Sequence, residues 1–148
     1  MVKRLPQLIL IIILVSSILA LFVVFSLNRQ VDKMGTAKLD EEFKLKINEK
    51  ISISEIGVTV TFLRIVEDSR CPVNVYCVWA GRVTVEVSIM KTNEGAFKIN
   101  LTLPNGDKKE FNGYAITLLR VNPQREYPDR MEIPASDYEI TLKISRQA

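Results

Sequence analysis

Residues 83–111, VTVEVSIMKTNEGAFKINLTLPNGDKKEF, carry the clearest signal of the fold. Apolar residues occupy every second position of residues 83–89 and again of residues 97–103. This period places one face of a strand in a core and the other in water, which is typical of antiparallel sheet. Between and after these runs, Thr92–Gly95 and Asn105-Gly106 supply turn residues, and Asn-Gly favours a two-residue type I′ hairpin. The stretch therefore predicts antiparallel strands joined by tight turns.

The same period recurs elsewhere after residue 41. It appears in residues 43–47, 58–62 and 138–144. Asn112-Gly113 predicts another reversal, and residues 122–135, here called the proline loop, contain three prolines and predict a long loop. No stretch of residues 41–148 has a convincing helical period. About seven short strands separated by turns predict an all-β fold, an antiparallel β-sandwich of immunoglobulin-like type, with a partly open barrel as the alternative.

A different composition marks the N-terminal part of the chain. Residues 8–27 contain no charged side chain, and sixteen of these twenty residues are Leu, Ile, Phe or Val. A helix of this length spans about 30 Å, the thickness of the hydrocarbon core of a bilayer. We therefore predict a transmembrane anchor over residues 8–27. A cleaved signal peptide is the alternative, although its apolar core is usually shorter. The first cysteine is Cys71, so a lipoprotein anchor is excluded.

The flanking charges predict the orientation of this anchor. Lys3 and Arg4 precede it, whereas Arg29 and Lys33 follow it together with Asp32. The positive-inside rule then favours a cytoplasmic N-terminus, residues 1–7. We predict that the polar residues 28–40 form a tether and that residues 41–148 form an extracytoplasmic domain. The expected location is the cell membrane, with a single pass and the C-terminal domain outside the cytoplasm.

The net charge of +3 belongs to the membrane flanks. Four of the 20 basic and one of the 17 acidic side chains lie in residues 1–34, which leaves 16 of each sign for the rest. A domain without excess positive charge has no electrostatic footprint for nucleic acid. We therefore expect no nucleic-acid partner.

The two cysteines, Cys71 and Cys77, are predicted to form a disulfide, because the domain is expected outside the cytoplasm. Cys77 and Trp79 occupy odd-numbered positions, like the apolar residues of 83–89, and so extend the same alternation towards the N-terminus. The disulfide is therefore expected to hold the preceding loop against the start of a strand that carries Trp79. Gly81 predicts a bulge or a close approach of two backbones.

Other chemistry for these cysteines lacks the expected residues. A thioredoxin-type pair has two intervening residues rather than five. A zinc site requires four ligands and a blue-copper site two histidines, but the chain contains no histidine. Copper(I) held by the cysteines with Met90 or Met131 has no supporting spacing, and a thiol redox sensor remains an alternative. We expect no metal and no cofactor.

The motif Asp68-Ser69-Arg70-Cys71-Pro72, followed by Cys77-Val78-Trp79-Ala80-Gly81, resembles one found in a family of small uncharacterised envelope proteins and lipoproteins of prokaryotes. The resemblance covers residues 67–82 and implies a single β-rich domain behind a signal or anchor. It implies no activity, because the family has none assigned.

A binding or structural role at the envelope, with an envelope protein as partner, is the leading hypothesis for function. No catalytic residue is predicted. The candidate binding residues lie in residues 68–76 and in the proline loop, whose aromatic and arginine side chains are typical of interfaces. They are Asp68, Arg70, Asn74, Tyr76, Arg125, Tyr127 and Arg130. An envelope-polymer hydrolase using Glu67 or Asp68 is the alternative, and Asn100 begins a glycosylation sequon on a predicted outward-facing position.

Overall fold

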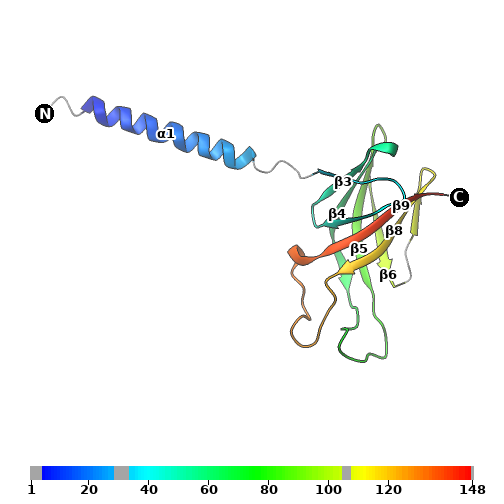
Figure 1. The fold of residues 1–148 in the computed structure, drawn as a ribbon. Helices are drawn as coiled ribbons and strands as arrows, with labels where there is room; N and C mark the ends of the chain where they lie inside the picture. The colour runs from blue at the N-terminus through cyan, green and yellow to red at the C-terminus, as the bar shows by residue number, and fades with distance from the viewer. Residues whose placement is uncertain (1–4, 29–33, 105–107, 148) are drawn as a thin grey trace. The chain divides into compact units, whose positions relative to one another are not determined.

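The computed structural model of the chain describes residues 5–28, 34–104 and 108–147 (Figure 1). The chain divides into two compact units, residues 1–32 and residues 33–148. The first unit contains helix α1 (Leu5–Asn28), in which side chains are described for residues 12–23. Within the described part of the chain, no helix combines the length and apolarity that a membrane crossing requires. The predicted transmembrane anchor, residues 8–27, includes residues 8–11 and 24–27, whose side chains lie outside the described part of the helix.

The second unit, here called the two-sheet domain, consists of two sheets. The first has the strand order β1-β3-β4-β5-β6 and the second the order β2-β9-β8-β7. The strands are β1 (Met34–Thr36), β2 (Glu42–Lys46), β3 (Lys50–Ile53), β4 (Val58–Asp68), β5 (Val83–Lys91), β6 (Gly95–Leu103), β7 (Lys108–Phe111), β8 (Tyr114–Asn122) and β9 (Glu139–Arg146). All pairings are antiparallel except that of β1 with β3. Single-turn 3₁₀ helices at Ser54–Ile56 and Ala135–Asp137 are the only other helices described.

One hydrophobic core lies between the two sheets. In β5 the alternating side chains Val83, Val85, Val87 and Ile89 are all completely buried. The second sheet contributes the inward-facing residues of β9, and both sets belong to one continuous cluster. The prediction of antiparallel strands with a period of two is therefore confirmed.

The turns agree with the sequence where they are described. Asn93 and Gly95, in the turn between β5 and β6, both have positive φ angles, as do Asn112 and Gly113 between β7 and β8. Positive φ angles are those that asparagine and glycine tolerate best. The predicted Asn105-Gly106 hairpin lies outside the described residues.

Two segments differ from the prediction. Residues 34–36 were expected in the tether but form β1, which pairs in parallel with β3. Residues 77–81 were expected to begin a strand, but β5 begins only at Val83, and Trp79 is 83% exposed. The reason is local: the disulfide and a left-handed Gly81, with φ of 68°, turn the chain before the strand begins.

Irregularities in two long strands lie close to the end where the candidate site is found. The pairing of β4 with β5 shifts register twice, and that of β8 with β9 shifts once. Such bulges increase the twist of a strand and redirect the residues that follow. β4 then ends at Asp68 and β8 at Asn122, so both enter long loops at the same end of the domain (Figure 1).

Candidate functional site

Two loops far apart in sequence lie side by side at one end of the two-sheet domain (Figure 1). They are residues 69–82, here called the cysteine loop, and the proline loop. The backbone N–H of Val73 donates to the carbonyl of Arg125 at 2.9 Å. Asn74 donates its Nδ2 to the carbonyl of Tyr127 at 2.6 Å and accepts from the Tyr127 N–H at 2.8 Å. The Asn74 amide thus pairs with the proline loop as a neighbouring strand would.

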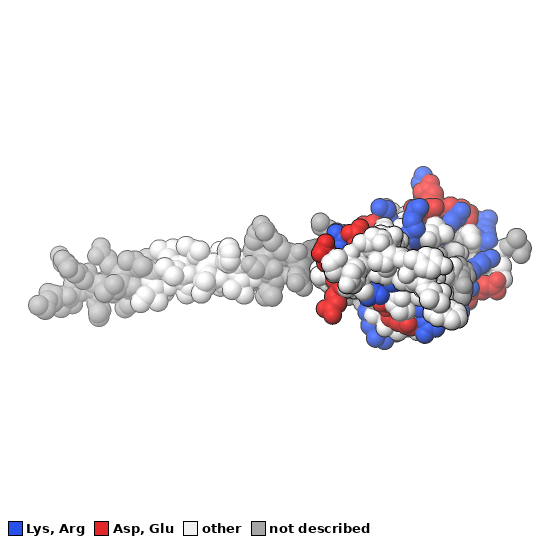
Figure 2. Space-filling model, turned by 90° about the horizontal axis from the view of Figure 1, so that it is seen from below, with Lys and Arg blue, Asp and Glu red and all other residues white. Residues whose placement is uncertain are grey.

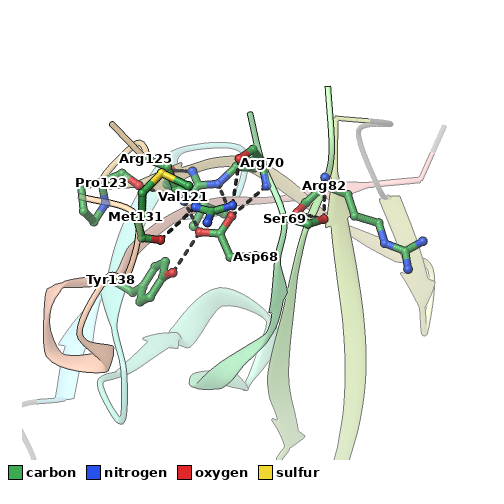
Figure 3. Close-up of polar contacts among 9 residues, drawn as sticks. All are labelled: Asp68, Ser69, Arg70, Arg82, Val121, Pro123, Arg125, Met131 and Tyr138. Atoms are coloured by element: carbon green, nitrogen blue, oxygen red, sulfur yellow. Dashed lines mark hydrogen bonds and ion pairs between the residues drawn. The ribbon is translucent and has the colours of Figure 1, made fainter. Parts of the chain in front are cut away.

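An ion pair between Asp68 and Arg70 lies beneath these loops (Figure 3). The Arg70 guanidinium donates from Nε to Oδ1 of Asp68 at 2.8 Å and from Nη2 to Oδ2 at 2.6 Å, a bidentate arrangement. The Asp68 side chain is 7% exposed and that of Arg70 12%. Tyr138, just before β9, donates its hydroxyl to Oδ2 of Asp68 at 2.9 Å.

Arg70 also reaches the end of β8. Its Nη1 donates to the carbonyl of Val121 at 2.7 Å and its Nη2 to the carbonyl of Pro123 at 2.9 Å. Arg125 makes the reciprocal connection, because its Nη1 donates to the carbonyl of Arg70 and its Nε to the carbonyl of Met131, both at 3.1 Å. Two buried or half-buried arginines therefore hold the cysteine loop and the proline loop together.

The protonation states of this network follow from its contacts. Burial alone would raise the pKa of Asp68, but hydrogen bonds from Arg70 and Tyr138 and the charge of Arg70 hold it below the ordinary value. Burial, and then the hydrogen bond to the Asp68 carboxylate, raise the pKa of Tyr138 to about 12. At neutral pH the network therefore consists of a carboxylate, a guanidinium and a neutral phenol.

The cysteine loop is closed at its base and across its middle. Cys71 and Cys77 form the predicted disulfide, and the N–H of Cys71 donates to the carbonyl of Ala80 at 2.9 Å. A Cβ atom on Gly81 would lie 1.9 Å from the carbonyl oxygen of Ser69. The predicted close approach at Gly81 is therefore confirmed, and only glycine fits there.

Glu67 lies beside this network but on a separate ion pair. It accepts from Nε of Arg82 at 2.8 Å and from the Ser69 hydroxyl at 2.9 Å. These two hydrogen bonds lower the pKa of Glu67, with that from Arg82 the stronger cause. Both acids that the hydrolase hypothesis uses are thus ionised and already engaged by arginines.

Apolar side chains project outward from the two loops. Tyr76 is 98% exposed and Val78 85%, and neither packs on the core. We call this group the apolar tip; its members are Val73, Val75, Tyr76, Val78, Trp79 and Tyr127. Figure 2 looks onto this end of the domain and shows an uncharged centre with Lys, Arg, Asp and Glu around it. Exposed apolar side chains gathered on one end of a domain are typical of interaction sites.

A pocket of about 420 Å³ lies next to the cysteine loop. Ala80 and Gly81 line one side of it, and Leu103, Leu119 and Val121 contribute apolar wall from the ends of β6 and β8. Trp79, which directly precedes this wall in sequence, does not line the pocket.

The structure brings the seven predicted binding residues to one end of the domain but divides their roles. Asp68, Arg70, Asn74 and Arg125 hold the loops together through their side chains. Tyr76 and Tyr127 project outward, and Arg130 is exposed and pairs through its backbone with Glu126. The sequence did not predict Trp79 and Val78 as surface residues, or Tyr138 as a partner of Asp68.

Two other predicted features can be located. Asn100 lies on β6 with its side chain exposed, as its outward-facing position required, while its glycosylation stays a prediction. Among the described residues, no cluster of three or more His, Cys, Asp or Glu side chains could hold a metal ion.

No protein-family model, curated protein or solved structure matches this chain. The resemblance of residues 67–82 to prokaryotic envelope proteins therefore stays a prediction. Function must be inferred from the geometry of the two loops.

Proposed function

We propose that the chain is a single-pass membrane protein of the cell envelope whose immunoglobulin-like β-sandwich domain lies outside the cytoplasm and binds a partner through the apolar tip. The uncharged residues 8–27 support the anchor, because their length and composition suit a bilayer. The Cys71–Cys77 disulfide supports an oxidising compartment. The motif in residues 67–82 supports an envelope location.

The observation that carries the binding role is the division between inward polar and outward apolar side chains. Arg70, Asn74 and Arg125 direct their polar atoms to carboxylate or backbone groups within the two loops. The side chains left facing outward at the apolar tip are aromatic and aliphatic, headed by Tyr76 and Trp79. Rigid loops that present aromatic side chains lose little entropy on binding.

A hydrolase using Asp68 has less support. Oδ1 of Asp68 accepts from the backbone N–H and Nε of Arg70, and Oδ2 accepts from Arg70 and Tyr138. A general acid or base must reach the substrate, whereas this carboxylate is buried beneath the loops. Its role is to position Arg70.

Photo-crosslinking in native membranes tests the binding role. A photoreactive phenylalanine analogue replaces Tyr76 in the full-length chain, and the same analogue replaces Met90 in a control. Met90 is also apolar and 50% exposed, but lies near the opposite end of β5. We expect a specific adduct from position 76 and none from position 90. Equal adducts from both positions, or none from either, would contradict the proposal.

A further inference from the structure

The pocket beside the cysteine loop lies where the second sheet is one strand short. β7 pairs with β8 only as far as Thr117, and β8 then continues to Asn122 without a second neighbouring strand among the described residues. Residues of this uncovered part of β8 line the pocket together with the end of β6 and the cysteine loop. Its volume of about 420 Å³ lies within the range of sites that enclose small ligands.

The polar groups of the pocket are all basic or neutral. Arg70, Arg120, Asn122 and Gln124 contribute to its lining beside the apolar wall, and no acidic residue within the described part of the chain does so. Guanidinium groups only donate hydrogen bonds, and amides can donate as well. The pocket therefore favours a ligand with an anionic, hydrogen-bond-accepting end and an apolar body.

Arg70 supplies the most rigid of these donors. Its side chain is 12% exposed, and four hydrogen bonds hold it to the Asp68 carboxylate and to the carbonyls of Val121 and Pro123 (Figure 3). A guanidinium has five N–H groups, so one N–H of Nη1 has no partner among the described residues. A largely buried donor in this state gains from an acceptor, and Arg70 lines the pocket in which one can be placed.

The charges around the pocket indicate which anion suits it. Asp68 balances Arg70, and Glu42 pairs with Arg120 at 2.6 Å. The second pair is solvent-exposed and contributes little, so a ligand can compete with Glu42 for Arg120. Because both arginines already have counter-ions, a singly charged carboxylate fits better than a phosphate dianion.

We propose that this pocket binds the carboxylate of a small ligand with an aliphatic body. Arg70 and Arg120 bind the carboxylate, and the leucine side chains at the ends of β6 and β8 enclose the body. The carboxylate belongs to a free organic acid or to the C-terminal residue of a peptide. No residue of the apolar tip lines the pocket, so the inference goes beyond the proposed function and does not depend on it.

The test is a nuclear magnetic resonance titration of the ¹⁵N-labelled full-length chain in a neutral detergent. N-acetyl-leucine is the probe, and N-acetyl-leucinamide is the matched control with the same body and no charge. We expect N-acetyl-leucine to shift the amide resonances of Ala80, Gly81 and Leu119 in a saturable manner. The resonance of Met90, near the opposite end of β5, should not move. The uncharged control should bind at least about 10-fold more weakly, because it loses hydrogen bonds to a charged group.

A pair of charge substitutions tests the role of the carboxylate while leaving Arg70 in place. Gln124→Glu adds a negative charge at an exposed position of the pocket lining. Gln147→Glu adds the same charge near Gly113, before the start of β8, whereas the pocket lies at its end. Gln124→Glu should raise the dissociation constant of N-acetyl-leucine by about 5-fold or more and leave that of N-acetyl-leucinamide nearly unchanged. Gln147→Glu should alter neither.

A tripeptide that ends in the same residue, acetyl-Ala-Ala-Leu, identifies the source of the carboxylate. Binding at least 10-fold tighter than that of N-acetyl-leucine supports a peptide C-terminus whose backbone follows the uncovered edge of β8, and equal or weaker binding supports a free acid. The absence of saturable shifts at the pocket with both probes would overturn the proposal, as would equal binding of N-acetyl-leucine and N-acetyl-leucinamide. Neither result would alter the crosslinking expected from position 76, so the two proposals fail independently.

Discussion

Tyr138 donates a hydrogen bond of 2.9 Å to Asp68, a residue 70 positions earlier in the chain. The bond joins the residue before β9 to the end of β4, and so links one strand from each sheet at the base of the two loops. Asp68 in turn holds Arg70, which binds backbone carbonyls at the end of β8. The two loops that carry the apolar tip are therefore held in place by a polar network that is itself shielded from solvent.

Loss of the Asp68 charge should destabilise the domain. Asp68→Asn leaves the Arg70 guanidinium, 12% exposed, without its counter-charge. Removal of one partner of a buried ion pair costs about 3 kcal/mol or more in the free energy of unfolding. Urea denaturation of the full-length chain, followed by circular dichroism, measures the change.

Glu67→Gln is the matched control for that substitution. Glu67 is the adjacent residue and also pairs with an arginine, but its pair with Arg82 is solvent-exposed. Exposed ion pairs contribute little to stability, so this variant should unfold close to the parent. Equal destabilisation by both substitutions would mean that the burial of Asp68 has no energetic consequence.

The raised pKa of Tyr138 predicts a dependence of stability on alkaline pH. The folded pKa of about 12 exceeds the ordinary value of 10.0, so the unfolded chain releases this proton first. The contribution of Tyr138 is therefore complete below pH 10 and is lost as the pH rises towards 12. The difference in ultraviolet absorbance between the parent and Tyr138→Phe, followed as a function of pH, isolates the titration of Tyr138. Asp68→Asn should lower the Tyr138 pKa, because it removes the accepting carboxylate; an unchanged titration would contradict the hydrogen bond.

Asp68 acts in the opposite direction at acid pH. Its folded pKa lies below the ordinary value of 3.8, so its contribution is present above that pH and is lost as the pH falls through the folded value. Asp68→Asn should accordingly remove part of the acid sensitivity of the parent.

The strands could be predicted from the sequence because burial follows backbone alternation. Val83, Val85, Val87 and Ile89 alternate with polar residues, and the pleat alone places them on one face. The same rule failed at Trp79. This residue also has an odd number and so fits the alternation, but β5 begins only at Val83 and Trp79 lies in the loop before it. Periodicity does not detect a left-handed glycine or a disulfide that turns the chain.

The candidate site was predicted only in part, for a different reason. The sequence placed Asp68 and Arg70 beside the disulfide and Arg125 in a second loop, which the structure brings together. Whether such residues face a ligand or one another depends on contacts between segments more than 50 positions apart, as between Arg70 and Pro123. A single sequence contains no record of those contacts. Asp68, Arg70 and Arg125 were therefore predicted to bind a partner together with Tyr76 and Tyr127, whereas Trp79 was expected to lie on a strand.

Gly81 should be far less tolerant of substitution than another left-handed glycine of the same domain. Gly81→Ala would place a Cβ atom 1.9 Å from the backbone oxygen of Ser69, at a φ of 68°. Gly113→Ala has a similar φ of 78° but meets nothing within 4 Å. Gly113→Ala therefore carries only the left-handed backbone cost, roughly 1–2 kcal/mol. Gly81→Ala must add displacement of the cysteine loop, so its midpoint in urea should be clearly lower; equal midpoints would exclude the close approach.

Reduction of the disulfide distinguishes a structural bridge from a thiol sensor. Removal of the Cys71–Cys77 link frees a short loop of the unfolded chain, which lowers the free energy of unfolding by roughly 2 kcal/mol in the chain-entropy model. The bridge lies outside the core between the sheets, so the reduced chain, or Cys71→Ser with Cys77→Ser, should stay folded by circular dichroism. If the bridge only preorganises the apolar tip, reductant should weaken binding of the partner, and the double serine variant should bind equally weakly with or without reductant. If free thiols instead act as a sensor, the reduced parent and the serine variant should differ from each other in binding, and a purely structural role for the bridge would be excluded.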